Sequence, residues 1–126
     1  MVYATTCSRK TLYASLEMKT ETIKHLYSDY QFEITIDEKG CCFCPVCGIK
    51  TENKDWRPYN DDGTPTYDIC ECGFEYGFDD SGVPPYEESW VRYRKSWLNE
   101  ELDFGDSKTK SLGKKIEQLK NIGIFI

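Results

Sequence analysis

The chain of 126 residues has few long apolar runs, one histidine and no surplus of positive charge. No stretch approaches the roughly 18 consecutive apolar residues of a membrane-spanning helix. Residues 1–17 also lack the apolar segment of a secretion signal, so we expect a cytoplasmic protein with no membrane partner. With 22 acidic and 16 basic residues the net charge is −6, which disfavours nucleic acid as a partner because phosphate contacts need clustered Lys and Arg.

The hydrophobic core is expected to be small. Apolar residues make up 39% of the chain and charged residues 30%, and much of the apolar content is aromatic, with 6 Phe, 9 Tyr and 3 Trp. This length fits one domain with one core. We therefore expect a further source of stability besides the burial of apolar side chains.

The seven cysteines supply a candidate for that source. Six of them fall between residues 41 and 72. Such a cluster, in a chain without a secretion signal, indicates metal binding before it indicates disulfides, because cytosolic thiols are kept reduced.

The first cysteine pair is Cys44 and Cys47, separated by two residues and followed by Gly48. Two thiolates at this spacing reach one ion from a single tight turn, in which Pro45 sets one φ angle and the glycine supplies a left-handed conformation. This pattern predicts a metal knuckle.

The second pair, Cys70 and Cys72, is separated by a single residue. We predict that both bind, completing a site of Cys44, Cys47, Cys70 and Cys72; the alternatives are that Cys41, Cys42 or His25 replaces one of the second pair. Four thiolates suit Zn²⁺ or a rubredoxin-type iron, and the ligand type does not separate these metals. The single His argues against hydrolysis, because a catalytic zinc keeps an open position and usually has His or carboxylate ligands.

The residues around the cysteines resemble a known family. The segments 43–48 (FCPVCG), 67–70 (YDIC) and 72–80 (CGFEYGFDD) are similar to bacterial cysteine-rich CPCC-type zinc-ribbon proteins, and 90–98 and 116–122 resemble the helical tail of some members. The chain departs from the family at residues 70–72, where relatives place two residues between the cysteines. The resemblance implies a zinc ribbon, and it implies that an immunity role is worth testing because some relatives accompany toxin genes.

Local patterns predict the elements outside the cysteines. Leu12, Leu16, Ile23 and Tyr27 recur at helical spacing, which predicts a helix within 10–28, whereas alternation at 32–36 predicts a strand. The turn-forming residues 60–63 predict the tip of a β-hairpin between 50–57 and 64–69.

Helices are predicted over 86–102 and 111–121, and the apolar end 124–126 is expected to pack as an edge strand or plug. Arg94 and Glu101 fall within the apolar arc of the first of these helices. We expect them to reach its edge with their charged ends in water; burial of Arg94 against an acid of the ribbon is the alternative.

These patterns together predict an α+β fold: a zinc-ribbon β-hairpin core with a preceding strand and C-terminal helices. The expected division is an N-terminal extension (1–29), which the helical spacing makes a candidate helix, a zinc ribbon (30–82) and a helical segment packed on the ribbon (83–126). The net charge is uneven along the chain. It is 0 for residues 1–54, −9 for residues 55–103 and +3 for residues 104–126.

The functional hypothesis follows from that acidic middle. We expect a zinc-binding protein that is not an enzyme and that acts through a protein partner, such as a basic toxin domain that it neutralises. The candidate contact residues are Asp79, Asp80, Glu87 and Glu88; a solvated acidic face is the alternative. A rubredoxin-like iron electron carrier and a zinc-ribbon nucleic-acid binder are the other functions to be tested.

Overall fold

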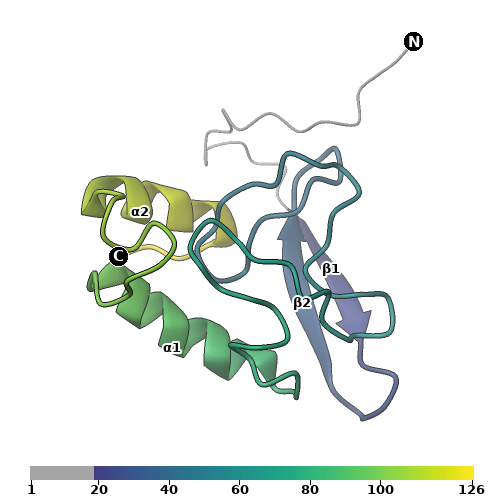
Figure 1. Ribbon diagram of the computed structural model, residues 1–126. Coiled ribbons are helices and arrows are strands. Elements are labelled where there is room, and N and C mark those ends of the chain that lie inside the picture. Colours follow the sequence, from purple (N-terminus) through teal and green to yellow (C-terminus); the bar gives the residue numbers. More distant parts are fainter. Residues whose placement is uncertain (1–18) are drawn as a thin grey trace.

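The computed structural model describes residues 19–126. Figure 1 shows the order of its elements along the chain. These are two strands, two α-helices and a short 3₁₀ helix: β1 (Lys19–Lys24), β2 (Gln31–Ile36), α1 (Tyr86–Leu98), α2 (Leu112–Leu119) and η1 (Lys120–Ile122). The predicted α+β class is therefore confirmed.

Strands β1 and β2 form a two-stranded antiparallel sheet in which Ile23 lies opposite Phe32. The predicted strand at 32–36 is confirmed, and its alternation buries Phe32 and Ile34. The predicted helix is wrong over 19–24, because pairing with β2 overrides the weak helical spacing; its earlier part lies outside the described residues. Since β1 and β2 share one sheet, a boundary at residue 29 would divide that sheet.

Between β2 and α1 the described chain forms turns joined by isolated bridges. The predicted turn at 60–63 is present: the Asn60 amide donates to the Thr64 carbonyl at 2.7 Å, and Tyr59 bridges Pro65. The flanking strands over 50–57 and 64–69 do not form. Pro58 and Pro65 have no amide hydrogen to extend a ladder, and the zinc-ribbon hairpin stays a prediction.

Both predicted helices are confirmed, with α1 shorter than expected. It ends at Leu98 because Glu100 adopts a left-handed φ of 59°. Helix α2 begins after Ser111, whose hydroxyl accepts the Lys114 amide, and the turn that follows it ends at Gly123 with φ 80°. Within residues 19–126, neither helix is long and apolar enough to span a membrane.

The expected C-terminal plug is wrong for its last two residues, since Phe125 is 66% and Ile126 71% exposed. Ile124 is half-buried, and its amide donates to the Leu119 carbonyl at 3.1 Å. Ile124 therefore packs against the apolar core of the described residues.

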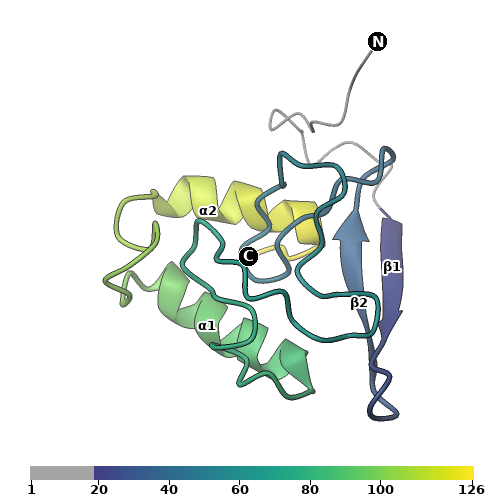
Figure 2. The same ribbon diagram turned by 45° about the vertical axis from the view of Figure 1, so that its right-hand side comes forward.

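Helices α1 and α2 lie side by side on one flank, and the sheet lies on the other, with the turn-rich segment between them (Figures 1 and 2). One apolar cluster joins these parts, with members such as Phe32 from β2, Trp97 from α1 and Leu119 from α2. Cys44, Cys47 and Cys72 belong to the same cluster. The segments predicted from the sequence thus share a single core around the cysteines.

Candidate metal centre

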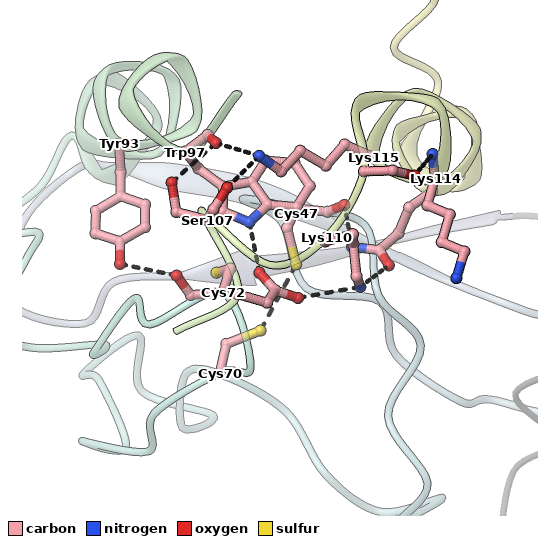
Figure 3. Close-up of polar contacts among 12 residues, drawn as sticks. Cys47, Cys70, Cys72, Tyr93, Trp97, Ser107, Lys110, Lys114 and Lys115 are labelled. Atoms are coloured by element: carbon pink, nitrogen blue, oxygen red, sulfur yellow. Dashed lines mark hydrogen bonds and ion pairs between the residues drawn. The ribbon is translucent and has the colours of Figure 1, made fainter. Parts of the chain in front are cut away.

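The sulfur atoms of four cysteines converge on one point. Cys44, Cys47, Cys70 and Cys72 each offer a sulfur, and these atoms all lie within 4.8 Å of one another. A tetrahedral ion with metal–sulfur bonds of about 2.3 Å requires sulfur atoms about 3.8 Å apart. The Cys47 and Cys70 sulfurs are 3.7 Å apart (Figure 3), so the residues present fit a tetrahedral four-thiolate site.

The first pair sits in a closed turn, which we call the first knuckle (residues 43–50). The Cys44 carbonyl accepts the Gly48 amide at 2.8 Å, and the Cys44 amide donates to the Ile49 carbonyl at 2.8 Å. Gly48 has a φ of 84°, the left-handed conformation expected from the sequence. The Val46 amide lies 3.4 Å from the Cys44 sulfur and donates to it.

The second pair sits in a similar turn that is one residue shorter, the second knuckle (residues 69–75). Here the Cys70 carbonyl accepts the amide of Gly73, three residues on rather than four, and the Cys70 amide donates to Phe74. Gly73 has a φ of 95°. Each of the two hydrogen bonds of this turn thus spans one residue fewer than its counterpart in the first knuckle, which accommodates the single residue between the cysteines. Both sulfurs still reach the centre.

Side chains from the helical half hold the backbone of the first knuckle. All four carbonyls of residues 45–48 accept hydrogen bonds from α1, α2 and η1. The pairs are Arg94 Nε to Val46 at 2.6 Å, Arg94 Nη2 to Pro45 at 2.8 Å, Gln118 Nε2 to Cys47 at 3.0 Å and Asn121 Nδ2 to Gly48 at 3.0 Å. Arg94 therefore does not extend into water, and it pairs with no acid among residues 19–126. It binds the ligand loop directly.

The sequence singled out Arg94 because a charged residue interrupted an apolar arc. Gln118 and Asn121 carried no such signal, because polar residues near a helix end are ordinary. The second knuckle is held similarly: Tyr93 Oη donates to the Cys72 carbonyl at 2.9 Å (Figure 3).

The electrostatics of the thiols favour a bound cation. Burial opposes ionisation of Cys44, but hydrogen bonds from the three neighbouring thiols and from Tyr76 hold its pKa well below the usual range. Burial, with the thiols beside them, raises the pKa values of Cys47 and Cys72 well above it. One thiolate is thus stabilised by its neighbours, whereas four thiolates in this buried site need a positive ion to offset their repulsion.

Tyr76 supplies a hydrogen bond to the site that the sequence did not reveal. Its hydroxyl lies 2.8 Å from the Cys44 sulfur. Burial raises the pKa of Tyr76 well above its ordinary value, and the nearby thiolates raise it further. The hydroxyl therefore keeps its proton and donates to the thiolate, an interaction that tunes metal–thiolate sites.

The alternative ligands lie outside this cluster. Cys42 is buried, its sulfur lies 3.4 Å from the Phe43 carbonyl, and burial raises the pKa of its thiol. His25 Nδ1 and the Ser28 hydroxyl form a hydrogen bond in the turn after β1. Cys41 is not a member of the group either, so the two knuckles account for all four sulfurs.

Of the four acidic residues predicted to face a partner, Asp80 is wrongly assigned. It is 1% exposed and accepts hydrogen bonds from the Tyr59 hydroxyl at 2.7 Å and from two glycine amides. Asp79 and Glu87 are half-buried; they accept from the Glu75 amide and the Tyr30 hydroxyl, respectively. Glu88 is exposed in the first turn of α1.

A buried lysine ties the two helices together. Lys115 is fully buried, and its amine donates to the carbonyls of Trp97 at 2.7 Å and Ser107 at 2.5 Å (Figure 3). Its Nζ also lies 5.2 Å from the Trp97 ring centre. A cation at the last turn of α1 is favourably placed against the helix dipole, so Lys115 fixes the pair of helices that holds the first knuckle.

The four-thiolate set leaves no open position on a tetrahedral ion, which is the arrangement of structural rather than catalytic zinc sites. A scan against protein-family models and searches of curated proteins and of solved structures gave no match. The resemblance to the CPCC-type family therefore stays a prediction, and what is established is a cysteine-rich α+β protein whose Cys44, Cys47, Cys70 and Cys72 could hold a metal ion.

Proposed function

We propose that this is a non-catalytic zinc protein in which the metal stabilises a scaffold that binds a protein partner. The convergence of four cysteine sulfurs within 4.8 Å is the observation that carries the proposal. Zinc takes such thiolate sets in structural sites, and structural zinc contributes about 10–16 kcal/mol of apparent binding free energy in small domains. That contribution would supplement the small apolar core.

The partner is proposed to be basic. Residues 55–103 carry a net charge of −9, and a charge surplus of one sign speeds association with a surface of opposite sign. The family resemblance adds a specific case, in which the protein neutralises a basic toxin domain in the cytoplasm. Nucleic acid fits the same charge poorly because its phosphates would be repelled.

Metal identity is tested by elemental analysis of protein purified without added metal. The proposal expects about one equivalent of zinc per chain, no visible absorption, and loss of the metal in a variant with Cys44→Ser and Cys72→Ser. A Cys42→Ser variant is the matched control, because Cys42 is buried outside the cluster. Iron with visible thiolate absorption would instead favour the electron carrier, and a folded protein without metal would refute both.

Partner binding is tested with the zinc-loaded protein immobilised on a support. Proteins retained from an extract are purified individually and titrated against the free protein by calorimetry at low and high salt. The proposal expects a basic protein that binds with a defined stoichiometry and weakens as salt rises, because screening reduces the attraction. Only acidic ligands, or binding insensitive to salt, would contradict it.

A further inference from the structure

An exposed apolar groove lies against the one metal ligand that is not fully buried. Cys70 is half-exposed, whereas the other three cysteines of the site are buried. A groove of about 360 Å³ beside it is lined by Ile69, Phe78 and Phe104, which are 67%, 72% and 54% exposed. A second groove, of about 370 Å³, is also lined by Cys70 and Ile69.

The backbone explains why Ile69 faces outward. The Cys70 amide donates to the Phe74 carbonyl and the Tyr76 amide to the Asp68 carbonyl, so 67–70 and 74–77 run antiparallel. Alternate side chains then face opposite ways: Phe74 and Tyr76 are buried, whereas Ile69 lies across from Glu75 on the outer side. Ile69 is therefore turned outward by the same segment that supplies Cys70.

Backbone strain marks the same surface. Tyr67 has a φ of 69°, a conformation that a bulky residue rarely adopts, and its side chain is 62% exposed. Its ring lies over Gly77, where an added Cβ would be 2.4 Å from the ring. The ring of Tyr67 thus lies on the surface at Gly77, the residue before Phe78 in the chain, and strained residues of this kind cluster at binding sites.

The charged residues that line the groove are acidic. Residues 67–80 include five acidic and no basic residues. Among the described residues that line the groove, Glu75 and Asp79 carry charge and both are acidic. An apolar centre beside carboxylates is complementary to an apolar side chain flanked by Lys or Arg.

We propose that this groove beside Cys70 is the docking site for a basic segment of a protein partner, with one aromatic or aliphatic side chain of that segment seated between Ile69, Phe78 and Phe104. The inference rests on the proposed protein-binding function and names its surface. It differs from the surface predicted from the sequence, because Glu87 and Glu88 lie in α1 outside the groove and Asp80 is buried.

The test uses the zinc-loaded protein and a library of random 12-residue peptides displayed on phage. Enriched peptides are synthesised, and their affinities are measured by fluorescence anisotropy for the wild type and for Phe78→Ser, Glu75→Gln and Val91→Ser. Val91 is the matched control because it is 58% exposed on α1 and does not line the groove. Zinc content and amide spectra of each variant establish that the fold is retained.

The proposal expects enriched peptides to combine Lys or Arg with an aromatic or aliphatic residue. Phe78→Ser should weaken their binding about tenfold or more, as at the centre of an interface, and Glu75→Gln about threefold at low salt. Val91→Ser should leave binding unchanged, and the amide shifts caused by the peptide should fall on residues 67–80 and 104–105.

Three results would overturn the inference. Peptides that bind Phe78→Ser as tightly as the wild type, or whose amide shifts fall outside residues 67–80 and 104–105, would refute this site. They would leave protein binding as the function. Enrichment of acidic or uncharged peptides would refute the basic partner. Failure to enrich any peptide would refute recognition of a short segment, while the capture of folded proteins described above would test the proposed function separately.

Discussion

Replacing Gly48 with Ala tests whether the helices and the metal centre form one structural unit. Gly48 ends the first knuckle with a φ of 84°, and a Cβ there would lie 2.4 Å from the backbone oxygen of Gln118 in α2. Ordinary contacts of a Cβ begin near 3.4 Å. Because the obstacle is the backbone of a helix, rotation of a side chain cannot relieve the overlap, and the helix or the knuckle must move by about 1 Å.

The expected loss of stability in Gly48→Ala has two parts. An alanine in the left-handed conformation costs about 1–2 kcal/mol relative to glycine, and overpacking against a neighbour that cannot rotate away costs typically about 1–3 kcal/mol. The free energy of unfolding should therefore fall by about 2–5 kcal/mol in Gly48→Ala. Displacement of α2 should also strain the hydrogen bonds from Gln118 and Asn121 to the knuckle, so the metal should leave faster.

Two further alanine variants separate these parts. Gly40 has a φ of 86° with no atom within 4 Å of an added Cβ, so Gly40→Ala should lose only about 1–2 kcal/mol. Gly113 lies in α2 with open space around it, so Gly113→Ala should gain about 0.5–1 kcal/mol through helix propensity.

The assays are denaturant unfolding of the metal-loaded protein and the rate of metal transfer to a chromogenic chelator. The Gly48→Ala variant should have a clearly lower free energy of unfolding than Gly40→Ala. It should also release metal faster than the wild type, Gly40→Ala and Gly113→Ala. Equal stability of the Gly48 and Gly40 variants, with equal release rates, would refute the close packing of α2 on the knuckle.

Three other substitutions probe buried polar groups. Lys115→Met should lower the free energy of unfolding by about 1–3 kcal/mol, because it removes the lysine donor from the Ser107 carbonyl and one of the donors to the Trp97 carbonyl, which keeps the Ser107 hydroxyl; the neighbouring exposed residue gives the control, Lys114→Met, with little change. Asp80→Asn should lose about 2 kcal/mol in thermal or denaturant unfolding, since an amide donor would then face the Tyr59 hydroxyl, and a stability equal to wild type would contradict the buried role. Burial would raise the pKa of Asp37, but the hydrogen bond from Lys50 and backbone amides lowers it overall. Its stabilisation is therefore present at neutral pH and lost as pH falls through the lowered value, so the deficit of Asp37→Asn, about 3 kcal/mol at pH 7, should shrink below pH ~4 in urea titrations.

The parts of the structure that sequence analysis predicted are those encoded by neighbouring residues. The spacing of Cys44 and Cys47, with a proline between them and a glycine after them, already describes a turn. Periodic apolar residues likewise located α1 and α2 within a few positions. Strand β1 was missed because its sequence, KTETIK, has little pattern of its own; it becomes a strand through pairing with β2, which no local rule reports.

The wrong assignment of Asp80 to a partner surface has a local cause. Asp80 and Asp79 are adjacent in an acidic run, and composition alone makes both look solvent-exposed. The structure separates them, because the turn at 77–82 directs the Asp80 carboxylate inward toward Tyr59 and two glycine amides. Whether an acid faces water or an amide nest depends on backbone angles such as the left-handed φ of Gly77 and Gly82, which follow from the packed chain rather than from charge.

The arrangement around the first knuckle suggests how a chain with few apolar residues keeps a metal site in one geometry. Each of the four carbonyls at 45–48 is bound by a side chain from the helical half. The amide of Val46 and the hydroxyl of Tyr76 lie at the Cys44 sulfur, where hydrogen-bond donors favour a thiolate. Arg94 also brings a positive charge to the loop that carries two thiolates. The helices therefore do more than cover the knuckle, because their side chains fix the backbone of the loop whose Cys44 and Cys47 could hold a metal ion.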